Sequence, residues 1–271
     1  MHDVADTRVP WTTQTRTFAS RHVRQVLRNR MILVLAVAWP VLWYFLTLAF
    51  FVEAPSGQAG GVKAGMAITY GLLGAFTITV AVFAGDFARD LDGERYRKFR
   101  AMPISPTADL AGRLLAGMVF GVGSYAATLL VSIVHGAEFG RPSIGAIGVI
   151  ALTLVLFCFV AMSFATVLAL VVTKPEHMTT IAVIGVLIAF YATGFNGVSP
   201  QLLADGADMI NYLPNSLATR MQIAALSSDV SYMTPPEAPD SIEFVGLLAG
   251  YAAVLLATAV LILRRFAYAP E

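Results

Sequence analysis

Long apolar runs separated by short polar stretches make up most of the chain. A helix needs about 20 apolar residues to cross about 30 Å of hydrocarbon. We therefore predict an all-α, polytopic membrane protein with six transmembrane helices. The predicted spans are residues 31–52, 64–85, 114–135, 144–173, 178–196 and 244–263. The fourth run is longer than the bilayer is thick, so it is expected to tilt or bend.

Two patterns inside these runs predict how the spans pack. Pro40 interrupts the first span, which membranes tolerate when a neighbour hydrogen-bonds the carbonyl that the proline frees. Gly117 and Gly121 form a GxxxG pair in the third span, a pattern that favours close helix contact but is common in Gly-rich spans.

The polar region 1–30 precedes the first span, and from residue 11 its pattern becomes helical. Apolar residues recur on one face and arginines on another; the defining positions are Phe18, Val26, Arg21, Arg24 and Arg28. Such a helix is expected to lie in the membrane interface, with its rings toward the acyl chains and its arginines toward the headgroups. The alternative is a simple extension of the first span into water.

Composition supports the membrane assignment. The chain is 57% hydrophobic and 13% charged, whereas soluble domains are about 25% charged. The net charge of +1 gives no field that would attract nucleic acid. The single cysteine, Cys158, lies in an apolar run, where a small packed residue is the simplest interpretation.

The stretch 86–113 concentrates charges of both signs between the second and third spans. Each charge at the centre of a bilayer costs about 2.5–3.5 kcal/mol, so this region is expected in water or against another protein. With the N-terminus inside, fifteen of the 18 Lys and Arg residues fall on the cytoplasmic side, and Lys63, Arg141 and Arg220 fall outside. The positive-inside rule then places both termini in the cytoplasm. We expect the protein to lie in the plasma membrane.

The sequence lacks the motifs of common catalytic sites. It contains no G-x-x-x-x-G-K-[ST], H-E-x-x-H or G-x-S-x-G, and its four histidines fall in four different regions. We therefore expect no enzyme activity, cofactor or metal site in this chain. No span carries a central carboxylate, which counts against an ion-coupled carrier.

Residues 94–102 are predicted to form a short helix that Pro103 ends. Tyr96, Phe99 and Met102 share one stripe of this helix, and basic residues flank it. Such an element is suited to insertion into a groove of another protein. The alternative is a solvated loop that anchors the topology through its charge.

The run RYRKFRAMPISPTADLAGRLLAG at residues 95–117 resembles the signature of ABC-2 type (type V) permeases of ATP-binding cassette exporters. The likeness is closest to the daunorubicin-resistance-like subgroup, whose run reads RFR-x-M/L-P-[small or aliphatic]-[ST], followed by GR. The matching positions are Lys98, Phe99, Arg100, Met102, Pro103, Ile104, Ser105, Gly112 and Arg113. The chain departs from the subgroup at Glu94 and Arg95, where glycine is frequent, and at Pro106, where arginine is.

The resemblance implies a permease subunit that pairs with a second copy, as a homodimer, and with two separate ATPase subunits that bind ATP and Mg. A coupling region at 86–113 would contact the ATPase, with the amphipathic helix alongside. The implied contact residues are Glu94, Arg95, Tyr96, Arg97, Lys98, Phe99, Arg100, Met102 and Pro103. Residues 197–243 would form short external helices, with 213–220 as the family's Pro-containing segment.

The resemblance also implies a translocation path along spans two and five at the subunit interface. The candidate residues are Thr69, Phe76, Thr77, Phe83, Tyr191, Phe195 and Asn196; ordinary helix packing is the alternative for each. Such a path favours export of an amphipathic, drug-like or lipid-like substrate. The competing functional hypothesis is an ATPase-independent secondary carrier or channel.

Overall fold

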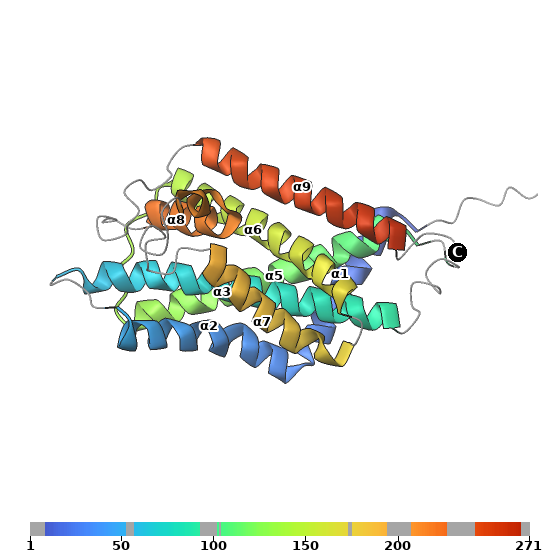
Figure 1. The fold of residues 1–271 in the computed structure, drawn as a ribbon, viewed down its shortest axis with the longest axis horizontal. Coiled ribbons are helices and arrows are strands. Elements are labelled where there is room, and N and C mark those ends of the chain that lie inside the picture. Colours follow the sequence, from blue (N-terminus) through green and yellow to red (C-terminus); the bar gives the residue numbers. More distant parts are fainter. Residues whose placement is uncertain are drawn as a thin grey trace, which may run out of the picture.

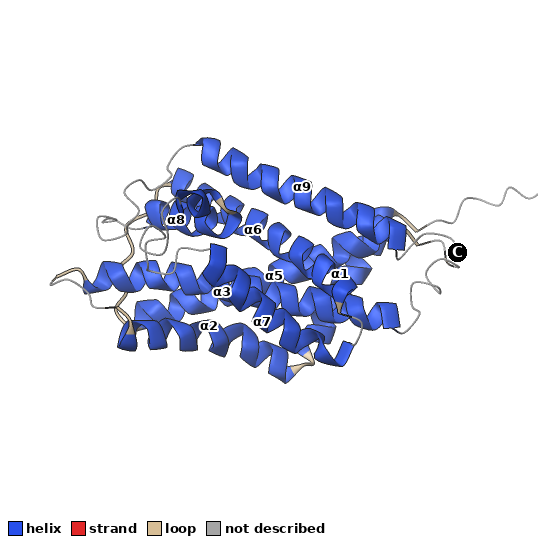
Figure 2. Ribbon diagram, viewed as in Figure 1, coloured by secondary structure: helices blue, strands red, loops and turns tan. Residues whose placement is uncertain are grey.

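The computed structural model describes residues 9–52, 57–92, 102, 104–172, 175–193, 207–226 and 242–266. These residues contain helices and connecting turns and no strand (Figure 2). The helices are α1 Trp11–Leu27, α2 Arg30–Phe50, α3 Ala59–Asp92, α5 Pro106–Val134, α6 Ile144–Val171, α7 Pro175–Thr193, α8 Pro214–Leu226 and α9 Ile242–Phe266. A short 3₁₀ helix, η2 Ala207–Tyr212, precedes α8.

Five of the described helices are long and apolar enough to cross a membrane: α2, α3, α5, α6 and α9. The apolar part of α7, Thr180–Thr193, is shorter than the others. The prediction of a multi-pass, all-helical membrane protein is therefore confirmed. The described residues contain five candidate spans, and the predicted fifth span, 178–196, runs past α7 into residues outside the described ones, so the count of six stays a prediction.

Helix α3 forms the centre of the bundle (Figure 1). It packs against α2, α5, α6, α7 and α8, and its most apolar stretch is completely buried. Helix α9 lies along α6, and α8 covers one end of the bundle. Because α3 packs against almost every other span, a shift of α3 would displace most of the helices in the bundle.

The two helices that flank the charged stretch are longer than predicted. Helix α3 has 34 residues and continues through Asp86 and Asp90, seven residues past the expected end of the second span. Helix α5 begins at Pro106, eight residues before the expected start of the third span. The region 86–113 is therefore two helix ends joined by a connection, and residues 93–101 and 103 lie outside the described residues.

Pro40 is accommodated as predicted, by a neighbour that takes over the freed carbonyl. In α2, Pro40 cannot donate to the carbonyl of Ala36, and the Ser124 hydroxyl of α5 donates to that oxygen instead. The ring also lies close to α3, because a Cβ added at Gly74 would be 2.7 Å from Pro40 Cγ. A glycine at position 74 therefore allows α2 and α3 to approach.

Helix α1 is separate from the first span, and its apolar face packs on the protein. It ends at Leu27, and a new helix begins at Arg30 after Asn29, whose side chain accepts from the Ile32 amide, so α1 does not simply extend the first span. Its apolar face was expected to meet acyl chains, but Phe18 and Val26 are buried against the protein. The reason is that α1 packs mainly on α5.

The segment between the last two spans is more enclosed than expected. Residues 197–243 were expected to form short external helices, and α8 packs against α6, α7, α9 and α3. Leu217, Ala218 and Thr219 are fully buried. Helix α8 is therefore part of the packed bundle.

Candidate functional site

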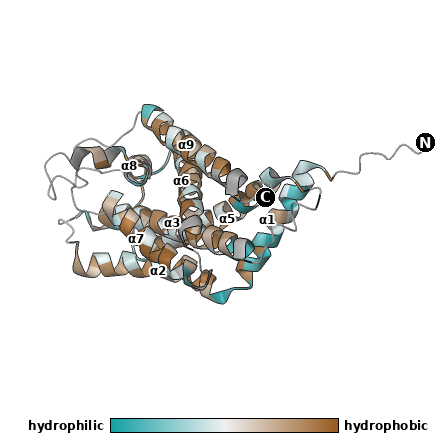
Figure 3. Cartoon of the chain, turned by 45° about the vertical axis from the view of Figure 1, so that its right-hand side comes forward, coloured by the Kyte–Doolittle hydropathy of each residue, from teal (hydrophilic) through white to brown (hydrophobic). Residues whose placement is uncertain are grey.

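A buried cluster of charged side chains joins α1, α3 and α5 at one end of the bundle, which we call the charged end. Its members are His22 from α1, Asp86 and Asp90 from α3, and Asp109 and Arg113 from α5. All five have relative exposures of 5% or less. Figure 3 shows the hydrophilic residues of α1 gathered at this end.

Arg113 and His22 are each held between aspartates of different helices. The Arg113 guanidinium pairs with Asp90 through Nη2, and its Nε donates to Asp109 Oδ2 at 3.1 Å. His22 Nδ1 lies 2.9 Å from Asp86 Oδ2, and its Nε2 lies 3.9 Å from Asp109 Oδ1. The side chains of Arg113 and His22 therefore each connect their own helix to another helix.

Asp86 collects further partners from the edge of the cluster. Gln25 Nε2 donates to its Oδ1 at 2.9 Å, and the half-exposed Arg89 pairs with the same oxygen. Because buried charges are tolerated when they are paired and hydrogen-bonded, this arrangement explains how so many charges lie inside the bundle. The expectation that residues 86–113 lie in water or against another protein is wrong for Asp86, Asp90, Asp109 and Arg113.

Helix α1 also holds the residues that follow the predicted coupling segment. Trp11 Nε1 donates to Thr107 Oγ1 at 3.0 Å, and Gln14 Oε1 accepts from the Ser105 amide at 2.9 Å. The same helix contacts the end of α3 through His22. Helix α1 therefore links both ends of the connection between α3 and α5.

Close contact between α1 and α5 depends on Gly112. A Cβ at this position would lie 2.5 Å from Phe18 Cβ and 2.9 Å from the Ala19 amide nitrogen. We expect Gly112→Ala to push α1 away from α5 and to destabilise the solubilised protein by roughly 1–3 kcal/mol. The measurement is thermal unfolding in detergent.

Gly123→Ala is the matched control, because it lies on the same helix with no atom within 4 Å of an added Cβ. Its stability should be unchanged or up to about 1 kcal/mol higher, since alanine favours a helix. Equal unfolding midpoints for the two variants would contradict the close packing of α1 on α5.

Most of the predicted ATPase-contacting residues lie outside the described residues. These are Glu94, Arg95, Tyr96, Arg97, Lys98, Phe99, Arg100 and Pro103. Met102 is described: its side chain is exposed and its carbonyl accepts from the Ile104 amide at 2.7 Å. Of the predicted interfacial arginines, Arg24 and Arg28 are exposed and Arg21 is half-buried.

The predicted path residues do not line one surface. Thr69, Phe76, Thr77 and Phe83 are all buried inside the chain along α3. Tyr191 of α7 is 41% exposed and packs edge-on against Trp43 of α2. Phe195 and Asn196 lie outside the described residues.

A groove of about 1060 Å³ does separate α2 from α7, with α3 as its floor. Apolar side chains of α2 and α7 form its walls, and Ala81 and Gly85 of α3 lie at its base. Asn29 and Arg89 supply polar groups. Helices α3 and α7 correspond to the second and fifth predicted spans. Both therefore border a groove, as the predicted path requires, but the residues that line it are not the predicted ones.

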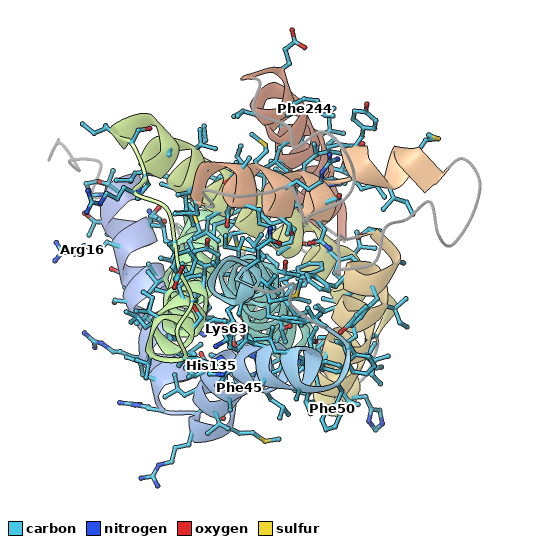
Figure 4. The ribbon with its side chains drawn as sticks, turned by 90° about the vertical axis from the view of Figure 1, so that its left-hand side faces the viewer. Arg16, Phe45, Phe50, Lys63, His135 and Phe244 are labelled. Carbon is cyan, nitrogen blue, oxygen red and sulfur yellow. The ribbon has the colours of Figure 1, made fainter. Side chains whose placement is uncertain are left out.

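The opposite end of the bundle carries a smaller polar cluster around His135 (Figure 4). Its Nδ1 lies 3.1 Å from the Tyr44 hydroxyl, and Lys63 Nζ donates to the His135 carbonyl at 2.9 Å. Desolvation, and then the charge of Lys63, lower the pKa of His135 below its ordinary value. In the neutral ring, Nδ1 can accept a hydrogen bond from the Tyr44 hydroxyl.

Several of the described helices are apolar and long enough to cross a bilayer, and they pack around the buried helix α3. This arrangement defines a multi-pass α-helical membrane protein. The sequence model of the ABC-2 type transporter family matches residues 13–202, from α1 to beyond α7. The chain belongs to the ABC-2 type transporter family, and it is a membrane permease component of ABC transporters. A comparison with curated proteins found no match.

Sequence reasoning missed the buried charge cluster, although a signal was present. Asp86 and Asp90 are four residues apart, as are Asp109 and Arg113, so each pair shares one face of a helix. If the two predicted spans had been extended into the charged stretch, these two helix faces would have been candidates for contact with each other. The contribution of His22 has no comparable signal, because it lies 64 residues from Asp86.

Proposed function

We propose that this chain is the permease subunit of an ATP-driven exporter of the daunorubicin-resistance-like subgroup. Two separate ATPase subunits supply ATP hydrolysis and bind ATP and Mg, a second copy of this chain completes the permease, and the chain itself is not an enzyme. The protein lies in the plasma membrane with both termini in the cytoplasm, so the charged end meets the ATPases. The alternative is an ATPase-independent carrier or channel.

The observation that carries this proposal is the position of α1 at the charged end. Helix α1 holds Ser105 and Thr107, which follow the coupling segment, and also Asp86 near the end of α3. Closure of an ATPase pair on residues 94–103 would therefore displace α1, α3 and α5 together. Because α3 is the core helix, this displacement would reorient the spans packed around it, a rigid-body change of the domain-closure type.

The groove between α2 and α7 supports an amphipathic substrate. Its walls are apolar, Asn29 and Arg89 supply polar groups, and it is large enough for a drug-sized molecule or a lipid chain. A molecule with an apolar body and one polar end would satisfy both regions. A highly charged substrate would lose its hydration against these apolar walls and would find few polar partners there.

The test is purification of the chain, gently solubilised, from its own cells. We expect a soluble polypeptide with a G-x-x-x-x-G-K-[ST] motif to co-purify with it and to hydrolyse ATP. In proteoliposomes, export of a lipophilic dye should require this second polypeptide and ATP. A complete transport cycle by the chain alone would instead establish the carrier or channel.

A further inference from the structure

The end of the bundle opposite the charged end holds a cation that is not neutralised by any carboxylate of the described residues. Lys63, in the second turn of α3, is half-buried, and its Nζ donates to the His135 carbonyl at 2.9 Å. Among the described residues it forms no ion pair. The exposed Glu138 instead lies against Gly60, where an added Cβ would be 2.5 Å from its Cδ. An ammonium has three N–H donors, so two remain for another partner.

His135 supplies a second donor beside Lys63. Its ring is packed edge-on against Phe45, with the two centroids 4.9 Å apart. When Nδ1 accepts from the Tyr44 hydroxyl, the neutral ring carries its proton on Nε2. Among the described residues Nε2 has no hydrogen-bond partner, and it keeps contact with the surface. The Nε2–H group can therefore donate to a ligand.

Two cavities meet at Phe45 and His135, which line both of them. The first has a volume of about 260 Å³, lies between the end of α2 and the start of α3, and is also lined by Lys63. The second has a volume of about 420 Å³ and follows the last turns of α5. Its remaining lining residues are all apolar: Leu130, Val131 and Val134. Leu130 and Val134 are 64% and 90% exposed, so this second cavity lies on the outer surface of the bundle.

The two donors lie where helices of membrane-spanning length end. Helix α2 ends at Phe50 and α5 ends at Val134, directly before His135. Figure 4, which looks onto this end of the bundle, shows Lys63, His135 and Phe45 side by side. A helix that crosses the hydrocarbon has its ends at the level of the lipid headgroups. The donors are therefore at headgroup level, and the apolar cavity extends from them along α5 toward the hydrocarbon.

We infer that this end of the bundle is a binding site for one anionic phospholipid of the bilayer, such as phosphatidylglycerol. The phosphate accepts from Lys63 Nζ and His135 Nε2, and one acyl chain lies in the second cavity against Leu130. The start of α3 is four residues before Lys63, and the dipole of a helix N-terminus also favours a negative charge. The site lies at the opposite end of α2 from Asn29, which supplies a polar group to the groove between α2 and α7.

Two other occupants fit this chemistry less well. A free inorganic anion would accept from the two donors but would leave the apolar second cavity exposed. A zwitterionic lipid carries its own cation beside its phosphate, so the charge of Lys63 would remain uncompensated. A lipid with a net negative charge satisfies both the basic groups and the apolar surface.

The test is native mass spectrometry of the full chain released from nanodiscs that contain equal amounts of phosphatidylglycerol and phosphatidylcholine with the same acyl chains. We expect one phosphatidylglycerol to be retained per chain, with about tenfold preference over phosphatidylcholine, because a charge-assisted hydrogen bond is stronger than a neutral one. An excess of sn-glycerol 3-phosphate, which has the phosphate without the acyl chains, should leave this lipid bound. Equal retention of the two lipids would overturn the inference, and so would displacement by glycerol phosphate.

A matched pair of charge variants locates the headgroup. Lys63→Met and Arg141→Met each remove one positive charge from this end of the bundle. Arg141 is exposed in the connection between α5 and α6 and lines neither cavity. Only Lys63→Met should lose the preference for phosphatidylglycerol. An equal loss in both variants would indicate general attraction of anionic lipids and would contradict a site at Lys63.

A second pair locates the acyl chain and does not alter any charge. Leu130→Trp fills the second cavity and should lower the retention of phosphatidylglycerol. Ile133→Trp, at an exposed position of the same helix outside the cavity, should not. Should Lys63→Met fail to fold, this pair decides, and unchanged retention by Leu130→Trp refutes the site. None of these measurements requires an ATPase, so they are independent of the proposed transport function.

Discussion

Replacing Arg113 by methionine is expected to destabilise the protein by about 3–5 kcal/mol, because the change leaves buried carboxylates without their shared cation. Arg113 is 3% exposed and pairs with both Asp90 and Asp109, one from α3 and one from α5. Methionine retains much of the packing volume, so the loss reports mainly on charge. The measurement is thermal unfolding of the detergent-solubilised chain, where we expect a midpoint lower by about 10 °C.

Arg89→Met is the matched control for this prediction. Arg89→Met removes the same charge from the same region. The Arg89 side chain, however, is 49% exposed, and Asp86 keeps its hydrogen bonds to His22 and Gln25 in this variant. Exposed ion pairs contribute about 0–1 kcal/mol, so this variant should melt close to the natural chain. Combining Arg113→Met with Asp90→Asn and Asp109→Asn should recover part of the loss. Equal effects of Arg113→Met and Arg89→Met would show that the buried cluster does not hold the charged end together.

Replacing Phe99 and Arg100 together by alanine is expected to abolish transport while leaving membrane insertion intact. If residues 94–103 insert into a groove of the ATPase, the ring supplies contact area and the guanidinium sets the orientation. Loss of such an anchor costs about 2 kcal/mol or more, which is roughly a 30-fold weaker contact. The two readouts are ATP hydrolysis and dye export by the same reconstituted complex, and only export should fall to background.

The control removes the same two side-chain types from the opposite end of the bundle. Phe50 is 75% exposed at the end of α2, and Arg141 is exposed in the connection between α5 and α6. Phe50→Ala with Arg141→Ala should retain coupled export. Undiminished export by the Phe99/Arg100 variant would refute the coupling role of this segment.

Hydrophobicity alone located the membrane-spanning elements, because long apolar runs have few structures available to them in lipid. The observed helices α2 and α6 begin within one residue of the predicted spans at 31–52 and 144–173. The close contacts of Gly117 and Gly121 are also confirmed, since an added Cβ would meet Met162 at 3.0 Å and Thr79 at 2.7 Å respectively. Pro40 likewise required an outside donor, which the sequence predicted without naming Ser124.

The ends of the helices could not be located in this way. Charged residues ended the predicted second span at residue 85, but α3 continues to Asp92 because its aspartates find partners on α1 and α5. Hydropathy measures the cost of placing a single charge in hydrocarbon. It does not include the stabilisation of that charge by a partner many residues away in the sequence. The same limitation placed the apolar face of α1 against lipid, although α5 covers it.

By itself, the sequence determined the class of fold and the approximate position of the five candidate spans among the described residues. Through the run around residues 95–117 it also pointed to the ABC-2 family, and the match over residues 13–202 shows that membership. Those properties depend on local composition and short motifs, which are complete within a few tens of residues. Only the tertiary structure decided which charges are buried, which path candidates are packed inside the chain, and where cavities lie. These features depend on pairs of side chains that meet across helices, and nothing local in the chain specifies those meetings.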